Sequence, residues 1–254
     1  MAFRIEAACV CNTGKVRRNN EDNFYFDGHS LPAENRGLDE TLLLSSPLRR
    51  LIYLAVFDGM GGENFGELAS FAAAEGMRGE EKRLRSVREP RAGLLKELCQ
   101  TLNEAVVSQA KELCTHHMGS TLSILCFSRD SVAVCNLGDS RAYRLRDGVL
   151  RQISKDHVEQ RPGRSSHKAP LTQYLGVDPE DYLLEPYLAK GALAAEDQYL
   201  LCSDGLTDML SDGEIAALMT AADSAEHCAE QLVQAALDHG GRDNVTVVVC
   251  RIRE

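Results

Sequence analysis

The order in which strand-like and helix-like segments follow one another constrains the fold of this chain more than any other feature. Short runs of Val, Ile, Leu and Tyr, bounded by Gly, Asp, Asn or Ser, are typical of strands. They predict strands at residues 3–11, 23–27, 51–57, 121–127, 132–136, 142–146, 149–153, 198–202 and 245–251. Apolar residues at three- and four-residue spacing predict helices at 65–77, 91–114 and 224–238.

Two helices in succession separate the early strands from the later ones, which is not the alternation of a parallel sheet. The order instead predicts antiparallel sheets with helices packed outside them, an α+β layered architecture. Ser211 and Glu214 have the spacing of a capping box that opens a further short helix. Residues 28–50 and 156–190 contain Pro, Gly and charges, and we expect both to be surface insertions.

Length and charge limit the classes of protein that this chain can belong to. No repeat or linker divides the 254 residues, so we expect one domain over 1–254. Lys and Arg number 28 against 38 Asp and Glu, a net charge of -10. This acidic balance argues against binding nucleic acid or docking on anionic lipid. The excess of carboxylates has two interpretations, namely solubility and the holding of cations.

The nine cysteines include no CxxC pair and have an odd total, which fits neither a zinc knuckle nor a disulfide framework. Several stand in apolar runs, where free cysteine behaves as a small hydrophobe. The start of the chain has no apolar core of signal-peptide length. The longest apolar run, 51–57, is far shorter than the about 20 residues that cross a bilayer. We therefore expect a cytoplasmic protein with reduced cysteines.

Carboxylates recur where predicted strands begin or end. A single Asp-Gly after a strand usually marks only a turn. Five such places in one chain change that judgement, because carboxylates gathered at one sheet edge repel one another unless a cation lies between them. Oxygen ligands without His or Cys favour Mg²⁺ or Mn²⁺ over zinc. The acidic residues in these places are Glu21, Asp22, Asp58, Asp139, Asp204 and Asp243.

Taken together, these motifs resemble the metal-dependent protein phosphatases of the 2C type, in their bacterial branch. The resemblance spans almost the whole chain and keeps the family's order. It is carried by Arg17-Arg18-Asn19-Asn20-Glu21-Asp22, Asp58-Gly59-Met60-Gly61-Gly62, Gly119-Ser120-Thr121, Gly138-Asp139-Ser140-Arg141, Asp156-His157, Ser203-Asp204-Gly205-Leu206-Thr207-Asp208 and Asp243-Asn244. It implies a four-layer αββα sandwich, with two central antiparallel sheets flanked by helices.

The resemblance also implies a reaction. Phosphoserine and phosphothreonine in proteins would be hydrolysed by a water that bridges two Mn²⁺ or Mg²⁺ ions, with no phosphoenzyme. By motif, Asp58 resembles the carboxylate that bridges both ions, and the Gly59 carbonyl resembles a ligand of the second. Asp204 and Asp243 resemble ligands of the first ion, and Glu21 resembles the remaining acidic contact to the second.

Two further residues receive roles from the resemblance. Asp22 looks like a neighbour that acts through metal-bound water. Arg17, four residues before Glu21, matches the arginine that grips the phosphate, as a planar guanidinium can do bidentately. The catalytic set is thus Arg17, Asp58 and Asp204. The residues alone leave other interpretations open: Arg17 as a solvated loop cation and Glu21 as a surface acid.

Three departures from the family pattern matter. Met60 stands where some relatives have a histidine proposed as general acid, and a thioether cannot donate a proton. Residues 114–118 read CTHHM and lack the aspartate with which some relatives bind a third metal, so we expect a third ion to bind weakly or not at all. The mobile flap of bacterial relatives corresponds to a short flap near 158–190, whose basic residues Arg161, Arg164 and Lys168 could help select substrates.

The expected partners are phosphorylated proteins, in particular substrates of a cognate serine/threonine kinase, with no nucleic acid and no membrane. We expect a monomer. One alternative is a pseudophosphatase that binds phosphoproteins as a scaffold, but the intact set Asp58, Asp204 and Asp243 favours the enzyme. A second alternative is a phosphatase dedicated to one anti-sigma-factor antagonist, for which no fused domain gives support.

Overall fold

Two antiparallel sheets lie face to face in the computed structural model, which describes residues 3–60, 65–115, 117–159, 169–180 and 182–254. The first sheet has the order β3 (Leu42–Pro47), β1 (Arg4–Asn12), β12 (Val245–Arg253), β11 (Gln198–Cys202), β8 (Arg141–Arg146) and β9 (Val149–Gln152). The second has the order β10 (Tyr187–Ala192), β7 (Ser131–Leu137), β6 (Leu122–Phe127), β4 (Ile52–Met60) and β2 (Asp22–Phe26). The short β5 (Gly119–Ser120) pairs with the end of β4.

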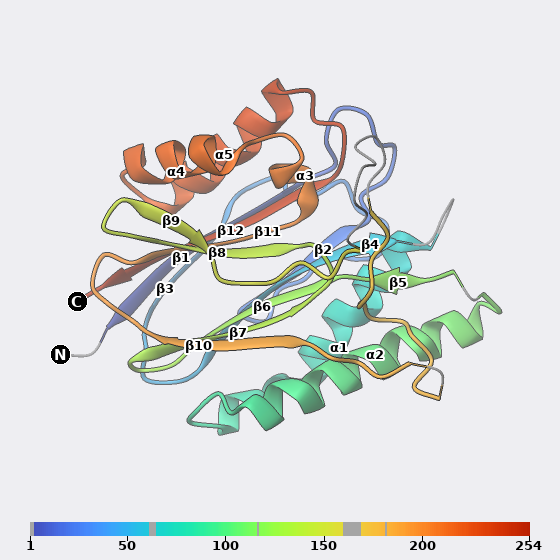
Figure 1. The fold of residues 1–254 in the computed structure, drawn as a ribbon. Helices are drawn as coiled ribbons and strands as arrows, with labels where there is room; N and C mark the ends of the chain where they lie inside the picture. The colour runs from blue at the N-terminus through green and yellow to red at the C-terminus, as the bar shows by residue number, and fades with distance from the viewer. Residues whose placement is uncertain (1–2, 61–64, 116, 160–168, 181) are drawn as a thin grey trace.

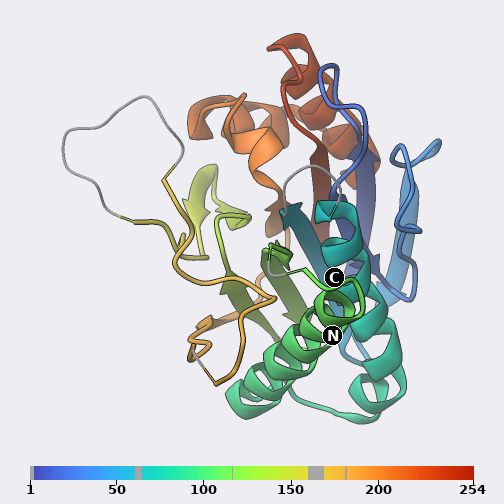
Figure 2. The same cartoon turned by 90° about the vertical axis from the view of Figure 1, so that its right-hand side faces the viewer.

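Helices cover the outer face of each sheet, as Figures 1 and 2 show. The pair α1 (Gly66–Ser86) and α2 (Ala92–Glu112) lies on the second sheet. The first sheet is covered by α4 (Asp212–Ala221) and α5 (Ala225–Asp238), with the single turn α3 (Asp204–Thr207) beside them. The predicted four-layer αββα sandwich is confirmed.

Side-chain alternation in the central strands produces three apolar layers. In β4, Ile52, Leu54 and Val56 enter the core between the sheets, whereas Tyr53 and Phe57 pack under α1 and α2. Successive side chains of a strand point to opposite faces, so a strand buried on both faces is apolar throughout. This explains why the central strands were visible in the sequence as continuous apolar runs.

The nine predicted strands and three predicted helices are confirmed, and Ser211 caps α4 in a capping box with Glu214. Five elements differ from prediction, and two of them, the short β5 and the single turn α3, were not predicted at all. Residues 28–50 and 156–190 were expected to be insertions, but β3 lies inside the first, and β10 begins in the second. Helix α1 continues to Ser86, nine residues beyond its predicted end at 77, through a polar stretch with few apolar residues.

The start of β1 and the end of β12 lie together at one end of the sandwich, and the strand ends that adjoin the acidic motifs lie at the other (Figure 1). The start of β2, the end of β4 and the start of β12 all reach that second edge. In the described part of the chain, the helices are too short or too polar to cross a membrane.

Candidate active site

Antiparallel pairing of β2 with β4 brings two of the acidic motifs together. The register places Asp22 directly opposite Asp58. One residue further, the Gly59 amide donates to the Glu21 carbonyl at 3.0 Å. Neighbouring backbones in a ladder hold their residues about 5 Å apart. The predicted metal ligands Glu21, Asp58 and Gly59 therefore belong to one rigid corner of the second sheet.

The backbone of Asp58 is held by the Gly-Ser-Thr motif. Its amide donates to the Thr121 hydroxyl at 3.0 Å, and its carbonyl accepts from the Thr121 amide at 2.9 Å. The Ser120 hydroxyl adds a third bond to the same carbonyl at 3.2 Å. Thr121 in turn contacts Ser140, with 2.7 Å between their hydroxyl oxygens. Two of the recognised motifs thus serve to fix the position of Asp58.

Gly66, at the first turn of α1, makes room for two predicted ligands at once. A Cβ at this position would lie 2.7 Å from Cδ of Glu21 and 3.0 Å from the Gly59 carbonyl oxygen. The Glu21 carboxylate and the Gly59 carbonyl therefore both lie within about 3 Å of the same point, where only glycine leaves enough space. Both were predicted as ligands of the second metal ion. The sequence reasoning missed Gly66, because a glycine at the start of a helix carries no distinctive signal.

Asn244 ties three segments of the site together. Its Oδ1 accepts from the Glu21 amide at 2.8 Å, and its Nδ2 donates to the carbonyls of Thr13 and Asn19 at 2.8 and 2.9 Å. Gly205 packs on the Asn244 backbone so closely that an added Cβ would lie 1.8 Å from the Asn244 carbonyl oxygen. The Asp204 and Asp243 motifs are therefore in contact. Asn244 was part of a recognised motif, but no role had been predicted for it.

Asp22 is 1 % exposed and accepts two short hydrogen bonds on one carboxylate oxygen. The donors are the hydroxyls of Ser203 and Thr246, each at 2.7 Å. The pKa of Asp22 is raised to about 7, mainly by burial; the two hydroxyls lower it, and the charges of Asp243 and Glu21 add to the rise. A buried carboxylate beside other carboxylates favours a neighbouring cation.

Arg17 forms an ion pair with Asp243, with 2.7 Å between Nη2 and Oδ2. This hydrogen bond is the main cause of a raised Arg17 pKa, and the charges of Asp243, Glu21 and Asp58 add to it. One guanidinium therefore interacts electrostatically with three of the predicted metal ligands. Its side chain remains 47% exposed, so it is accessible from solvent.

Glu21 is half-buried, and desolvation raises its pKa; Arg17 and Asn19 oppose this effect, while Glu67 and Asp243 add to it. Asn19 donates to both Glu21 and Glu67, at 3.4 and 3.2 Å. Fixed backbone and hydroxyl contacts thus hold carboxylates near one another although they raise each other's pKa, an arrangement that suits divalent cations with oxygen ligands.

The side chains are neighbours but do not enclose a preformed cage. Within the described ranges, no three acidic, His or Cys side chains are close enough together to hold one ion. Oδ2 of Asp243 accepts a hydrogen bond from Arg17 in this arrangement. The donor set, all carboxylate and backbone oxygen, nevertheless fits Mg²⁺ or Mn²⁺ chemically. Asp204 is 4 % exposed at the start of α3, and its neighbours Ser203 and Gly205 contact Asp22 and Asn244.

The surroundings of Met60 bear on the predicted lack of a general acid. Met60 pairs with Gly119 in the β4–β5 ladder, where an added Cβ on Gly119 would lie 3.2 Å from the Met60 methyl carbon and 2.9 Å from the Tyr174 ring. The thioether is therefore packed against β5 and residue 174, and a packed methyl group offers no proton.

The predicted flap is only partly within the described residues. Its base is a narrow pairing in which the Thr172 amide donates to the His157 carbonyl at 2.8 Å and the Glu159 amide donates to Pro170 at 3.0 Å. The predicted basic residues Arg161, Arg164 and Lys168 lie outside the described residues.

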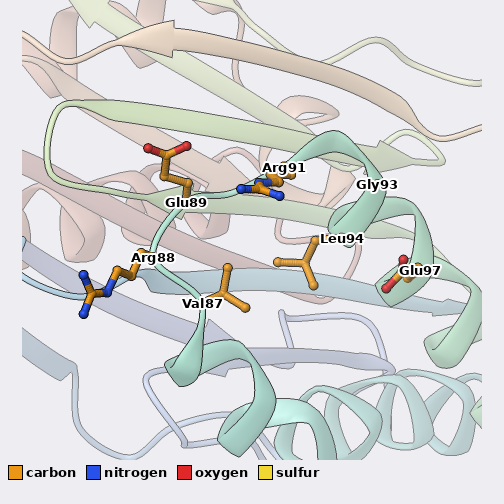
Figure 3. A pocket seen from close by; sticks show the side chains of 7 residues that line it. All are labelled: Val87, Arg88, Glu89, Arg91, Gly93, Leu94 and Glu97. Carbon is orange, nitrogen blue, oxygen red and sulfur yellow. The ribbon is translucent and has the colours of Figure 1, made fainter.

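A separate cavity of about 630 Å³ lies at the turn between α1 and α2, at the other end of the second sheet from the acidic motifs (Figure 3). It is lined by Val87, Arg88, Glu89, Arg91, Gly93, Leu94 and Glu97. None of the predicted site residues borders this cavity. We therefore assign it no part in the predicted reaction, although it is larger than the pocket beside Glu21.

Comparison with known proteins agrees with this geometry. The family model "Protein phosphatase 2C" matches residues 39–239. The chain belongs to the protein phosphatase 2C family.

Individual relatives are bacterial. The chain is 34% identical to the serine/threonine protein phosphatase PstP of Mycobacterium tuberculosis, over 98% of this chain and 45% of that protein, so it spans less than half of that relative's length. It is 30% identical to the serine/threonine phosphatase stp of Listeria monocytogenes, over 93% of this chain and 91% of that protein.

Solved structures give the same picture. The catalytic domain of PstP in complex with two manganese ions superposes with a TM-score of 0.76 at 31% identity, covering 99% of this chain and 100% of that chain. PppA of Pseudomonas aeruginosa superposes with a TM-score of 0.77 at 28% identity, covering 99% of this chain and 98% of that chain.

Proposed function

We propose that this chain is a metal-dependent phosphoprotein phosphatase that hydrolyses phosphoserine and phosphothreonine. The observation that carries the proposal is the position of Arg17. Its guanidinium binds Asp243 and interacts with Glu21 and Asp58, so a phosphate-binding group and three oxygen ligands for metal meet in one accessible place. Family membership and the names of the relatives support the same activity.

The residues of this chain divide the work as follows. Asp58 would hold both ions, Asp204 and Asp243 the first, and Glu21 with the Gly59 carbonyl the second. Two bound Mn²⁺ or Mg²⁺ ions would supply Lewis acidity and activate a water for attack on phosphorus. The PstP domain with two manganese ions supports this count. Asp22 would contact the metal ions through bound water, and hydrogen bonds from Ser203 and Thr246 would hold its carboxylate in place.

Arg17 would bind the phosphate and offset negative charge that builds up in the transition state. The ion pair with Asp243 uses Nη2, and a guanidinium has five N–H donors, so others remain for phosphate oxygens. Because Met60 has no proton to donate, the leaving oxygen must be protonated by solvent or by another group. We therefore infer that poor leaving groups react more slowly here than in relatives with a histidine at this position.

The direct test is hydrolysis of a phosphothreonine peptide with and without Mn²⁺. We expect turnover only with the metal, and a fall of about 100-fold or more in Asp204→Asn, because one charged ligand is lost. Asp130→Asn, an exposed acid in the β6–β7 turn, is the matched control and should keep wild-type rates. Full activity of Asp204→Asn would refute the site assignment. No turnover by the wild type with any of several metals would refute the enzyme.

The alternative of an inactive scaffold finds no support, since the relatives are themselves named phosphatases and the ligand set is intact. We infer that residues 1–254 act as one catalytic unit whose partners are phosphorylated proteins, in particular substrates of a cognate serine/threonine kinase in a signalling pathway. We further propose a cytoplasmic monomer that binds neither nucleic acid nor membrane. The acidic net charge and nine free cysteines, eight of them buried, support this proposal.

We also propose that the basic residues Arg161, Arg164 and Lys168 help to select substrates. In the sequence they lie between the two hydrogen-bonded segments that form the base of the flap. Replacing all three with alanine should raise KM for a phosphopeptide more than it lowers kcat. Unchanged kinetics would remove this part of the proposal.

A further inference from the structure

A pocket of about 290 Å³ adjoins the candidate active site on the side of Glu21. Two loops form most of its wall. One is the segment that follows Arg17, and the other is the segment between β2 and β3. It is lined by Arg18, Asn19, Asn20, Ala33, Glu34, Asn35, Arg36 and Glu67. Because the Asn19 side chain also contacts Glu21, the pocket and the site share a wall.

Specific hydrogen bonds hold the two walls together. Asn20, only 1 % exposed, donates to Oδ1 of Asn35 at 2.8 Å. The Asn35 side chain also donates to the Pro32 carbonyl at 2.9 Å and accepts from the Gly37 amide at 2.9 Å. The loop that carries Arg36 is therefore fixed relative to the loop that carries Arg17. Part of residues 28–50 therefore forms a wall of this pocket, a role that sequence patterns did not predict.

Two of the lining residues are cations without ion pairs. Arg18 and Arg36 are both exposed, and neither forms a salt bridge with a carboxylate of the described chain. Of the two acids in the pocket, Glu67 is engaged by Asn19, whereas Glu34 is exposed at the rim. In a protein of net charge -10, two arginines that line one pocket and form no ion pair with the described carboxylates stand out beside a site proposed to take an anionic substrate.

We propose that this pocket is a subsite for an acidic side chain that flanks the phosphorylated residue of the substrate. The inference rests on the proposed phosphatase function and deepens it by naming a preference. Arg17 would bind the phosphate, while Arg18 and Arg36 bind a carboxylate a few residues away along the same peptide. A guanidinium suits this role because its planar fork matches a carboxylate.

The test compares phosphothreonine peptides that differ only in flanking residues, which are Glu, Ala or Lys, placed before the phosphothreonine in one series and after it in another. For the wild type we expect kcat/KM to be about two- to fivefold higher for the best-placed Glu peptide than for its Ala counterpart, the range of exposed charge pairs. In the double variant Arg18→Gln with Arg36→Gln, this ratio should fall to about one. Because each variant is compared with itself across peptides, a general change in activity cancels.

The matched control is Arg88→Gln with Arg151→Gln, two exposed arginines from the α1–α2 turn and β9. It changes the net charge equally, and the Glu-to-Ala ratio should stay at the wild-type value. A ratio of one in the wild type, or a ratio that persists in Arg18→Gln with Arg36→Gln, would overturn the subsite.

Failure of the phosphatase itself would look different, because no peptide would be hydrolysed. Peptide binding to Asp204→Asn, followed by fluorescence anisotropy, would still measure the preference in that case. The Glu peptide should bind about two- to fivefold more tightly than the Ala peptide, and equal affinities would contradict the subsite.

Discussion

At the scale of single residues, the site depends on side chains that are absent as much as on those present. Gly66 has no Cβ, and this leaves space for the Glu21 carboxylate and the Gly59 carbonyl to lie side by side. Gly79 stands in the same helix with nothing within 4 Å of the place where its Cβ would be. Comparing the two glycines therefore distinguishes a steric requirement of the site, at Gly66, from the general preference of helices for alanine over glycine, at Gly79.

Gly66→Ala should weaken metal binding and lower metal-dependent activity, because its Cβ would displace Glu21 or the Gly59 carbonyl. Gly79→Ala should leave both unchanged and stabilise the protein by about 1 kcal/mol, since alanine is the better helix former. Isothermal titration with Mn²⁺ and thermal unfolding of both variants provide the measurements. Equal Mn²⁺ affinity in the two variants would contradict the role given to Gly66.

A site residue could be predicted only where it belongs to a recognisable sequence pattern. Asp58 and Asp204 stand after apolar runs, and Arg17 and Asp243 stand in motifs that resemble a known family. Gly66 carries no such mark. The contacts of Asn244 with Glu21 and Asn19 cross more than 220 residues of sequence, with separations of 223 and 225, and no local pattern can show them.

At the scale of elements, two of the three missed strands, β3 and β10, are at sheet edges, and the third is the two-residue β5. In β3, Leu42 and Leu44 face the core while Leu43 is 59% exposed, so the run lacks the continuous apolar character of a central strand. In β10, Lys190 and Gly191 interrupt the pattern, and the strand pairs with β7 alone. Edge strands are half-solvated, and their sequences resemble those of loops.

Helix α2 holds residues 176 and 177, within the predicted flap, through one buried side chain. Asn103 accepts from the amides of Gly176 and Val177 at 2.8 and 3.1 Å and donates to the Val177 carbonyl at 2.8 Å. Asn103→Leu should destabilise the protein by about 3 kcal/mol, because three backbone groups lose their partner. Hydrogen exchange should speed up at the amides of 176 and 177. The exposed neighbour variant Glu104→Ala is the control, and unchanged exchange in Asn103→Leu would count against the clamp.

The turn before β11 is held by an ion pair between the buried Asp197 and the partly exposed Arg146, and its contribution depends on pH. Asp197 accepts from Arg146 at 2.5 and 2.6 Å, from the Tyr199 hydroxyl at 3.0 Å and from the Ala194 amide at 2.9 Å. Burial alone would raise the pKa of Asp197, but these donors outweigh it and lower the pKa below its usual value. A lowered pKa in the folded state stabilises the protein above the unfolded pKa and is lost as pH falls.

Asp197→Asn should therefore cost about 3 kcal/mol of unfolding free energy at pH 7, since it leaves Arg146 without its partner. The difference from wild type should shrink as the pH falls below about 4, near the unfolded pKa of aspartate. Denaturant unfolding between pH 7 and pH 3 measures it. A difference that stays constant with pH would mean that Asp197 does not act through its charge.

At the scale of the whole molecule, the sandwich separates folding from function. The three apolar layers lie between and outside the sheets, and the predicted ligands come from one edge, where β2, β4, α3 and the start of β12 meet. The net charge of -10 is spread widely, and only a few of the 38 acids belong to this edge. Two divalent cations there would reverse the local sign of charge and let an acidic protein receive a phosphate.

The most direct test of this account is a count of the ions that the chain binds. Titration with Mn²⁺, followed by the electron paramagnetic resonance of free Mn²⁺, should find two ions per chain at micromolar metal. A third should be weak or absent, because residues 114–118 offer no carboxylate. Asp58→Asn should lower the affinity for both ions by about 10- to 100-fold, since Asp58 is proposed to hold both. Three occupied sites would contradict the reading of residues 114–118, and no bound ion, or unchanged binding in Asp58→Asn, would contradict the metal centre itself.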